Sequence, residues 1–490
     1  MNVLFIIADQ YRWDCVGAAG NPIIRTPNLD ALAQTGVLFT NCFVQACPCG
    51  PSRMCIYTSR YQCSTRTVDN MTPLMDAEEN VAKVLRDVGY APAIIGYNDY
   101  AVDPRMLPVG DRRTTGLSYA NFLPGLDARL YHEYDSPEYF DWLRRKGYPE
   151  WLLTHDTIHK PDIPAEGPGE HLPLRYPAYY RAEDSESQFV TSVAIDYLTK
   201  RRGKSWVLSL NYIKPHPPRI APAPYNDMYD PAAMPAPNRC PEELETDHPY
   251  LRHMRREPAL VSERDLRETQ ANYYAMITEL DTCLGRLFTA LHETAQWDDT
   301  LIIFTSDHGE YLGDHFFSDK AHFYDETMRV PLIIREPTRA ADAMRGRSLD
   351  YLCESIDFAP TMLDFLGVPI PDRFQGQSLL GLVRDTPDAA PKKRIHFEFD
   401  FRNRMRDVPA AAPDSCVLWV VRDTSYKYVQ FGLENMPPLL FDLKHDPEER
   451  KDLADQPEYA AVVADYCQTL LRWRMKHEDQ RMEHWASQFR

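Results

Sequence analysis

Val3-Leu4-Phe5-Ile6-Ile7-Ala8-Asp9 is an unbroken apolar run that ends in a carboxylate. A short apolar run without alternation suits a strand that is buried on both faces of a parallel sheet. Similar strand-like runs recur further along the chain, separated by helical stretches: strands at 91–97, 205–212 and 300–305, and helices at 80–88, 187–200 and 262–294. This alternation predicts an α/β fold, in which a large, mostly parallel sheet is flanked by helices.

The pattern changes after residue 383. Short strands without long helices are expected at 394–399, 416–422 and 426–431, followed by a helical tail at about 457–476. We therefore expect two domains. Residues 1–383 would form the large α/β domain, with insertions at about 104–181 and 215–261, and residues 384–490 a smaller antiparallel α+β domain. Long ordered insertions over one end of a sheet often line a binding site.

The composition excludes some partners. The 490 residues include 54 basic and 72 acidic side chains, for a net charge of -18. Nucleic acid or an anionic membrane would have to bind against this field, so we expect neither. The first residues lack the basic region and the apolar length of a signal peptide, which favours a cytoplasmic, reduced protein.

Eleven cysteines are present, and five of them crowd into residues 42–63. Their spacing differs from the paired Cys-x2-Cys form of zinc sites, so a zinc knot is only a minor alternative.

Polar residues follow each of the predicted parallel strands. Ligands of open parallel sheets bind beyond the carboxyl ends of the strands. The four runs end at Asp9, at Tyr97-Asn98-Asp99, at Lys214-Pro215-His216 and at Ser306-Asp307-His308-Gly309. Asp9, Asp307 and His308 offer oxygen and imidazole donors that suit one divalent ion. The alternative, that the two aspartates only cap the next helices, explains a single strand end better than four agreeing ones.

Cys49-Gly50-Pro51-Ser52-Arg53 precedes a predicted helix start. The unpaired N–H groups of a helix N-terminus favour an anionic nucleophile together with an anionic substrate. Cys49 is therefore the candidate nucleophile, and its pocket would have to be locally positive in an acidic protein.

These motifs, taken in order, resemble the formylglycine-dependent sulfatases and phosphonate monoester hydrolases of the alkaline phosphatase superfamily. The resemblance covers nearly the whole chain and implies an alkaline-phosphatase-like fold. The matching stretches are Asn2 to Asp9, Thr26 to Asp30, Cys49 to Arg53, Ser306 to Glu310, Lys320 with Arg329-Val330-Pro331, and Asp442-Leu443 with Asp446-Pro447.

The resemblance also implies roles for single residues. Cys49 would be converted by a formylglycine-generating enzyme to formylglycine, whose hydrate attacks the ester, and Arg53 would fix that hydrate. Asp9, Asp307, His308 and the residue derived from Cys49 would bind the metal, Mn²⁺ or Ca²⁺ first, with Zn²⁺ as an alternative. Toward the substrate, the catalytic residues would be His216 and Lys320, and the binding residues Asn70, Tyr97 and Lys214.

The sequence lies between the two subfamilies. Gln10 stands where many sulfatases have a second aspartate, and the run at 96–99 lacks their Gly-Lys-x-His pattern. Gln10, Asn70 and Tyr97 are similar to the phosphonate monoester hydrolases, although Asp99 replaces their small hydroxyl residue. Lys214 and the run Tyr324-Asp325-Glu326 are more similar to sulfatases.

We therefore expect, by a narrow preference, an arylsulfatase-like hydrolase of sulfate monoesters that is also promiscuous toward phosphonate monoesters and phosphodiesters. The second hypothesis makes phosphonate monoesters or phosphodiesters the main substrates. A third is a catalytically silent binding protein. The resemblance also favours a homo-oligomer, a dimer or a tetramer, to which the C-terminal tail around Leu470 and Trp473 could contribute.

Overall fold

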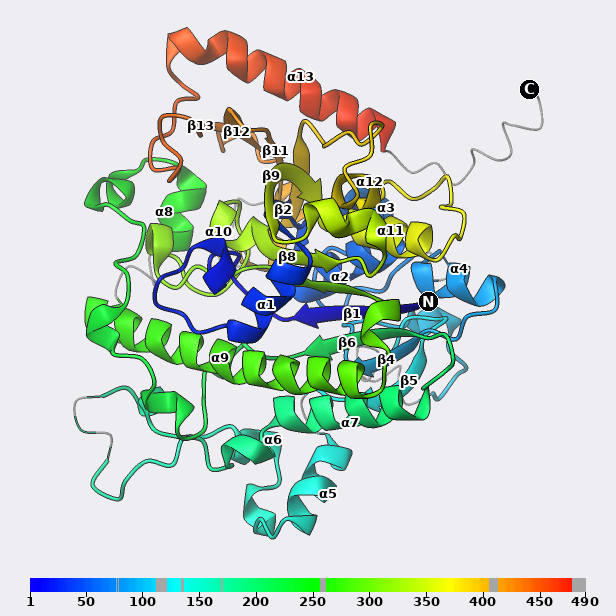
Figure 1. Cartoon of the computed structure of the whole chain (residues 1–490). Coiled ribbons are helices and arrows are strands. Elements are labelled where there is room, and N and C mark those ends of the chain that lie inside the picture. The colour runs from blue at the N-terminus through cyan, green and yellow to red at the C-terminus, as the bar shows by residue number, and fades with distance from the viewer. Residues whose placement is uncertain are drawn as a thin grey trace.

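A computed structural model describes residues 1–75, 77, 79–111, 121–133, 136–167, 169, 171–255, 261–404 and 413–477 of the chain. Parts of the predicted insertions, at 112–120, 134–135, 168, 170 and 256–260, and the end of the predicted second domain, at 478–490, lie outside the described residues. Two sheets organise the described part, and helices cover them (Figure 1).

The larger sheet has eight strands in the order β5-β4-β6-β1-β7-β8-β2-β9. Strand β8 runs antiparallel to its neighbours β7 and β2, and the other pairings are parallel. The predicted mostly parallel α/β sheet is thus confirmed. The strands are β1 (Asn2–Ala8), β2 (Val37–Phe43), β4 (Ala93–Gly96), β5 (Asp127–Tyr131), β6 (Val207–Tyr212), β7 (Thr300–Thr305), β8 (Arg329–Arg335) and β9 (Arg347–Glu354).

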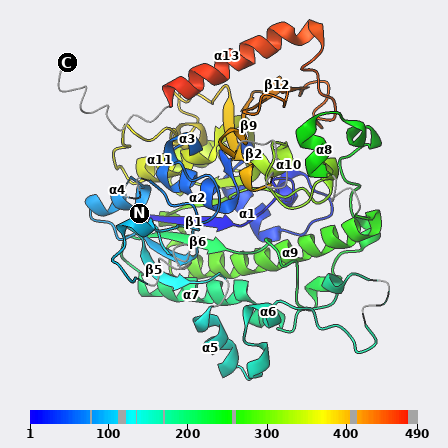
Figure 2. The same ribbon diagram turned by 180° about the vertical axis from the view of Figure 1, so that it is seen from behind.

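Helices cover both faces of this sheet because β1 is apolar on both sides. Leu4 and Ile6 pack in one buried cluster with α1 (Pro27–Thr35), α7 (Glu186–Lys200) and α9 (Glu263–Glu293). Phe5 and Ile7 pack in another cluster with α2 (Cys49–Thr58), α4 (Val81–Asp87) and α11 (Phe358–Phe365). Figures 1 and 2 show α7 and α9 along one side of the strands and α2 with α11 on the other. The other helices are α3 (Gln62–Thr65), α5 (Pro137–Arg145), α6 (His155–Ile158), α8 (Pro249–Arg255), α10 (Asp325–Met328) and α12 (Leu380–Val383).

The smaller sheet has the order β13-β12-β11-β10-β3. Its C-terminal strands form the predicted antiparallel unit: β10 (Ile395–Asp400), β11 (Val417–Arg422), β12 (Tyr426–Phe431) and β13 (Leu439–Asp442). Helix α13 (Ala460–Lys476) packs on β11 and β12. The fifth strand, β3 (Ala46–Cys47), pairs in parallel with β10 through Phe399 and Cys47. The C-terminal sheet therefore holds the segment that leads directly into Cys49, while the boundary at residue 383 stays a prediction.

Helix α13 leaves two apolar side chains in solvent, Leu471 and Met475. The predicted homo-oligomer stays a prediction. Within the described ranges, the structure contains no helix with the length and apolarity needed to cross a membrane.

Gly96 ends β4 at a close approach between two strands. Its φ is +102°, and a Cβ at this position would lie 2.1 Å from the Asn211 carbonyl oxygen on β6. Gly147 also has a positive φ, +88°, but a Cβ there would meet nothing within 4 Å.

We expect Gly96→Ala to lower the free energy of unfolding by about 2–4 kcal/mol, because left-handed strain adds to a clash with backbone that cannot turn away. Gly147→Ala has the strain alone and should lose only about 1 kcal/mol. Urea titration followed by tryptophan fluorescence measures both. Equal losses in the two variants would contradict the close approach at Gly96.

Candidate active site

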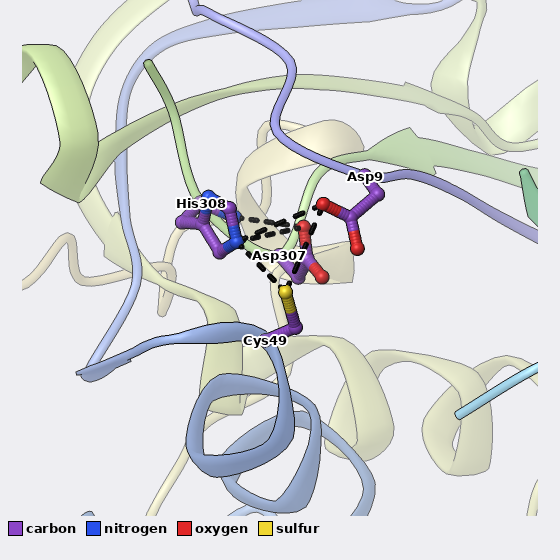
Figure 3. A group of neighbouring side chains, drawn as sticks. All are labelled: Asp9, Cys49, Asp307 and His308. Atoms are coloured by element: carbon purple, nitrogen blue, oxygen red, sulfur yellow. Dashed lines mark hydrogen bonds and ion pairs between the residues drawn. The ribbon is translucent and has the colours of Figure 1, made fainter. Parts of the chain in front are cut away.

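Four predicted metal ligands meet where β1 and β7 end and α2 begins. Asp9, Cys49, Asp307 and His308 are all buried, and one ligand atom from each lies within 4.8 Å of the others (Figure 3). The Cys49 Sγ is 3.2 Å from the His308 Nε2 and 3.8 Å from the Asp9 Oδ1. The His308 Nδ1–H donates a hydrogen bond to the Gly309 carbonyl oxygen at 3.0 Å. The other ring nitrogen, Nε2, faces the cluster and is the atom that could bind a metal.

This cluster fits a divalent cation. Two carboxylates and an imidazole form a donor set that such ions accept. Gln10, the residue in the place of a second aspartate, adds a further feature. Its Nε2 donates to Asp319 at 2.8 Å and to Glu310, while its Oε1 is buried and has no hydrogen-bond partner in the part of the chain that the structure describes. A buried, unsatisfied amide oxygen beside the cluster is what an additional oxygen ligand would leave when no ion is present.

Cys49 is the first residue of α2. At this end of a helix, the first backbone N–H groups have no hydrogen-bond partner within the helix. The Gly50 N–H donates to the Asn70 Oδ1 at 2.8 Å, so Asn70 satisfies one of these groups and is held beside Cys49. Lys320 donates to the Cys49 Sγ at 3.0 Å. Burial raises the pKa of the Cys49 thiol well above its ordinary value, and Asp9 adds to this effect while Lys320 opposes it.

Arg53 lies one turn further along α2 and is fully buried. Its Nε is 2.8 Å from the Asp307 Oδ2, and its Nη2 is 3.1 Å from the Asp9 Oδ2. The remaining Nη1 donates to the Asn211 Oδ1 at 3.1 Å. Arg53 therefore ties together the two predicted metal carboxylates from β1 and β7, rather than reaching into open space.

Tyr97 and Asp99 complete the surroundings of Arg53. The Tyr97 hydroxyl donates to the Asp9 Oδ2, and the Arg53 Cζ lies 4.2 Å from the centre of the Tyr97 ring. Asp99 is 3.3 Å from the Arg53 Nε. Tyr97 thus orients the oxygen of Asp9 that does not face Cys49.

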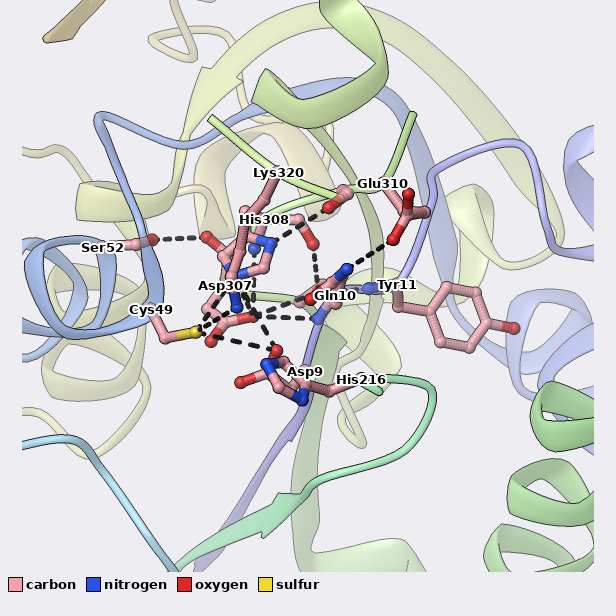
Figure 4. A network of polar contacts seen from close by, with 12 residues as sticks. Asp9, Gln10, Tyr11, Cys49, Ser52, His216, Asp307, His308, Glu310 and Lys320 are labelled. Atoms are coloured by element: carbon pink, nitrogen blue, oxygen red, sulfur yellow. Dashed lines mark hydrogen bonds and ion pairs between the residues drawn. The ribbon is translucent and has the colours of Figure 1, made fainter. Parts of the chain in front are cut away.

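His216 follows β6 and lies beside Asp9 (Figure 4). Its Nδ1 is 2.6 Å from the Pro217 carbonyl oxygen, which fixes the ring and leaves Nε2 as the atom able to act on a substrate. Burial lowers the pKa of His216, although the nearby Asp9 opposes this shift.

The two lysines that the sequence assigned to the substrate occupy different places. Lys320 reaches Cys49, as described above. The Lys214 Nζ is instead buried between Glu279, at 2.5 Å, and the Tyr180 hydroxyl, at 3.1 Å, and Lys214 is not among the residues that line the pocket. The structure therefore brings Lys320, Asn70, Tyr97 and His216 to the nucleophile, and it does not bring Lys214 there.

A pocket opens beside Cys49. Besides predicted residues, its walls include four side chains that the sequence analysis did not single out: Glu133, His155, His159 and Glu186. The spacing His155-x3-His159 on and after α6 was the one available signal, since it places both imidazoles on one side of a helical turn. Their rings lie 4.8 Å apart.

The chain is similar to known proteins along nearly its whole length. Residues 1–368 match the family model described as Sulfatase, and residues 313–476 match N-sulphoglucosamine sulphohydrolase, C-terminal. The multifunctional alkaline phosphatase superfamily protein PehA of Trinickia caryophylli is 39% identical, with 99% of this chain and 97% of that protein covered. An arylsulfatase of Clostridium perfringens is 27% identical, with 96% and 93% covered. The crystal structure of the phosphonate monoester hydrolase of Agrobacterium radiobacter is 36% identical with a TM-score of 0.90, and covers 98% of this chain and 97% of its own.

Proposed function

This chain belongs to the sulfatase family, within the alkaline phosphatase superfamily of hydrolases, and from that premise we propose that it hydrolyses phosphonate monoesters and phosphodiesters, with aryl sulfates as further substrates. The observation that carries the proposal is the position of the Cys49 Sγ. It lies 3.0 Å from the Lys320 Nζ and 3.2 Å from the His308 Nε2, so an attacking atom at residue 49 would sit between a predicted metal site and a cation for the substrate.

The nucleophile in this proposal is formylglycine at position 49. A maturation enzyme would oxidise the Cys49 side chain to the aldehyde, and hydration would give two hydroxyl groups on one carbon. One hydroxyl oxygen attacks phosphorus or sulfur and displaces the alcohol. Deprotonation of the second then breaks the bond between carbon and the ester oxygen, which releases the product anion and restores the aldehyde. An unmodified thiol has no second hydroxyl and could not complete this cycle.

The residues around position 49 would divide the remaining work. A divalent ion held by Asp9, Asp307 and His308 would supply positive charge that lowers the pKa of a bound hydroxyl. Lys320 would hold the nonbridging oxygens of the ester, and Asn70 would face the same group. Arg53 would keep the carboxylates of Asp9 and Asp307 in place, and Tyr97, which lines the pocket, would also hold Asp9.

Three sequence features favour a sulfate ester as the main substrate: Lys214, Lys320 and the run Tyr324-Asp325-Glu326. The choice between sulfate and phosphonate depends on where these residues lie. Lys214 is paired with Glu279 behind the pocket. Asp325 contacts Lys427 and Arg422, and Glu326 lies 3.6 Å from His315, so both support packing. Lys320 remains and serves either anion. Because Tyr97 and Gln10 lie at the centre of the site, we place phosphonate monoesters and phosphodiesters first, and a sulfate monoesterase is the second candidate.

We expect Cys49→Ser to lose at least about 10³-fold in kcat/KM toward p-nitrophenyl phenylphosphonate, or to stop after one turnover as a covalent ester. Steady-state rates and the mass of the intact protein after incubation with substrate distinguish these forms. Cys467→Ser, which changes an exposed cysteine on α13, is the matched control and should keep full activity. Wild-type turnover numbers in Cys49→Ser would remove formylglycine from the account.

His216 would protonate the leaving alcohol, so its contribution should depend on that alcohol. We expect His216→Ala to slow esters of alkyl alcohols by about 10²-fold or more, and p-nitrophenyl esters by less than about 10-fold, because p-nitrophenolate leaves without a proton. A series of phenylphosphonate esters with alcohols of graded pKa measures this dependence. The same loss with every alcohol would reject His216 as the acid.

A further inference from the structure

The pocket beside Cys49 extends past the reacting centre. The nucleophile end contains Asp9, Cys49 and His216, and the same pocket is lined by Glu133, His159 and Glu186. The anionic centre of an ester has to lie at Cys49 to react. Its organic part would then extend toward these further side chains of the same pocket.

Glu186 is the anion of this wall. It is the first residue of α7, a position at which the helix dipole favours a carboxylate. Its Oε2 lies 3.4 Å from the His132 Nε2 and 3.6 Å from the His159 Nε2. Burial alone would raise the pKa of Glu186, but His159, His132 and Lys214 lower it to about 2. Glu186 is therefore ionised at neutral pH.

Lys214 is a cation near Glu186, but it is paired with Glu279 and does not line the pocket. Burial lowers the pKa of His159 to about 4, so its imidazole is uncharged near pH 7. Lys320 and Arg53 lie at the nucleophile, and among the described residues that line the pocket there is no lysine or arginine. Glu133 adds a second carboxyl, whose Oε2 accepts a hydrogen bond from the Tyr131 hydroxyl at 2.6 Å. Burial raises the pKa of Glu133, so Glu186 is the firmer anion of the two.

We infer that Glu186, with Glu133 and His159, forms a subsite for a cationic group on the organic part of the ester, and that the preferred substrates carry a primary ammonium there. This inference rests on the proposed hydrolysis at residue 49. An ammonium donates hydrogen bonds to carboxylates and to neutral imidazoles, which are the groups present. A quaternary ammonium fits less well, because it needs aromatic faces, and the ring of the lining residue Tyr97 is already covered by Arg53.

Three phenylphosphonate esters test the subsite: 4-(aminomethyl)phenyl, the isosteric neutral 4-ethylphenyl, and 4-(trimethylammoniomethyl)phenyl. We expect wild-type kcat/KM to favour the first over the second by about 10-fold or more, as for a hydrogen bond between charged groups. The trimethylammonium ester should gain less. A p-nitrophenyl ester monitors hydrolysis without a cation.

Glu186→Gln should lower the ratio between the aminomethyl and ethyl esters by about 10-fold. The ratio within one variant cancels any general loss of activity, and comparing this ratio between a variant and the wild type cancels any difference between the leaving groups. Glu183→Gln removes an exposed carboxylate three residues earlier, outside the pocket, and should keep the wild-type ratio. Glu133→Gln provides a second variant and should also lower the ratio.

The possible results separate the two proposals. A p-nitrophenyl ester that is hydrolysed, combined with an aminomethyl to ethyl ratio that neither Glu186→Gln nor Glu133→Gln changes, overturns the subsite and leaves the hydrolase. A larger gain for the trimethylammonium ester overturns the preference for a primary ammonium. Absence of turnover with every ester, on protein that carries the aldehyde, overturns the hydrolase and the subsite with it.

Discussion

The site depends on the ion pairs that the buried guanidinium of Arg53 makes with Asp307 and Asp9. The guanidinium contacts Asp307 and Asp9 at the ends of two neighbouring strands and Asn211 at the end of a third. Two carboxylates without a cation would be very costly at this depth. Burial alone would raise the pKa of Asp9, yet His216, Lys320, His308 and Arg53 together hold it well below its usual range. Arg53 therefore holds the carboxylates of Asp9 and Asp307 in position before any metal binds.

The carboxyl ends of the parallel strands could be predicted because their signal is local. Apolar runs define β1, β4, β6 and β7, and in a parallel sheet the residues that follow such runs must share one edge. Asp9, Asp307 and His308 meet for this reason. The sequence does not predict strands β2, β5, β8 and β9 of the larger sheet. Pro331 interrupts the run of β8, and half of β9 is solvent-exposed, so neither of these two has the continuous apolar pattern of a central strand.

The remaining parts of the site depend on contacts between distant segments. Lys214 follows a predicted strand as His216 does, but Glu279 on α9 is its partner, and no spacing along the chain shows this. In the sequence, Glu186 has the position of an ordinary acidic residue at the start of a helix, where the helix dipole favours a carboxylate. Glu186 lines the pocket that contains Cys49 only because α7 packs beside that pocket. Side-chain type at strand ends can thus be read from sequence, whereas charge balance in the pocket cannot.

The most direct test of the account is a side-by-side measurement of kcat/KM for p-nitrophenyl phenylphosphonate and p-nitrophenyl sulfate, on metal-replete protein whose residue 49 is confirmed by mass as the aldehyde. The account predicts turnover of both esters with a clear preference for the phosphonate. A clear preference for the sulfate would contradict the weight placed on Tyr97 and Gln10. Turnover of neither would contradict the assignment of residue 49 as a hydrolytic nucleophile.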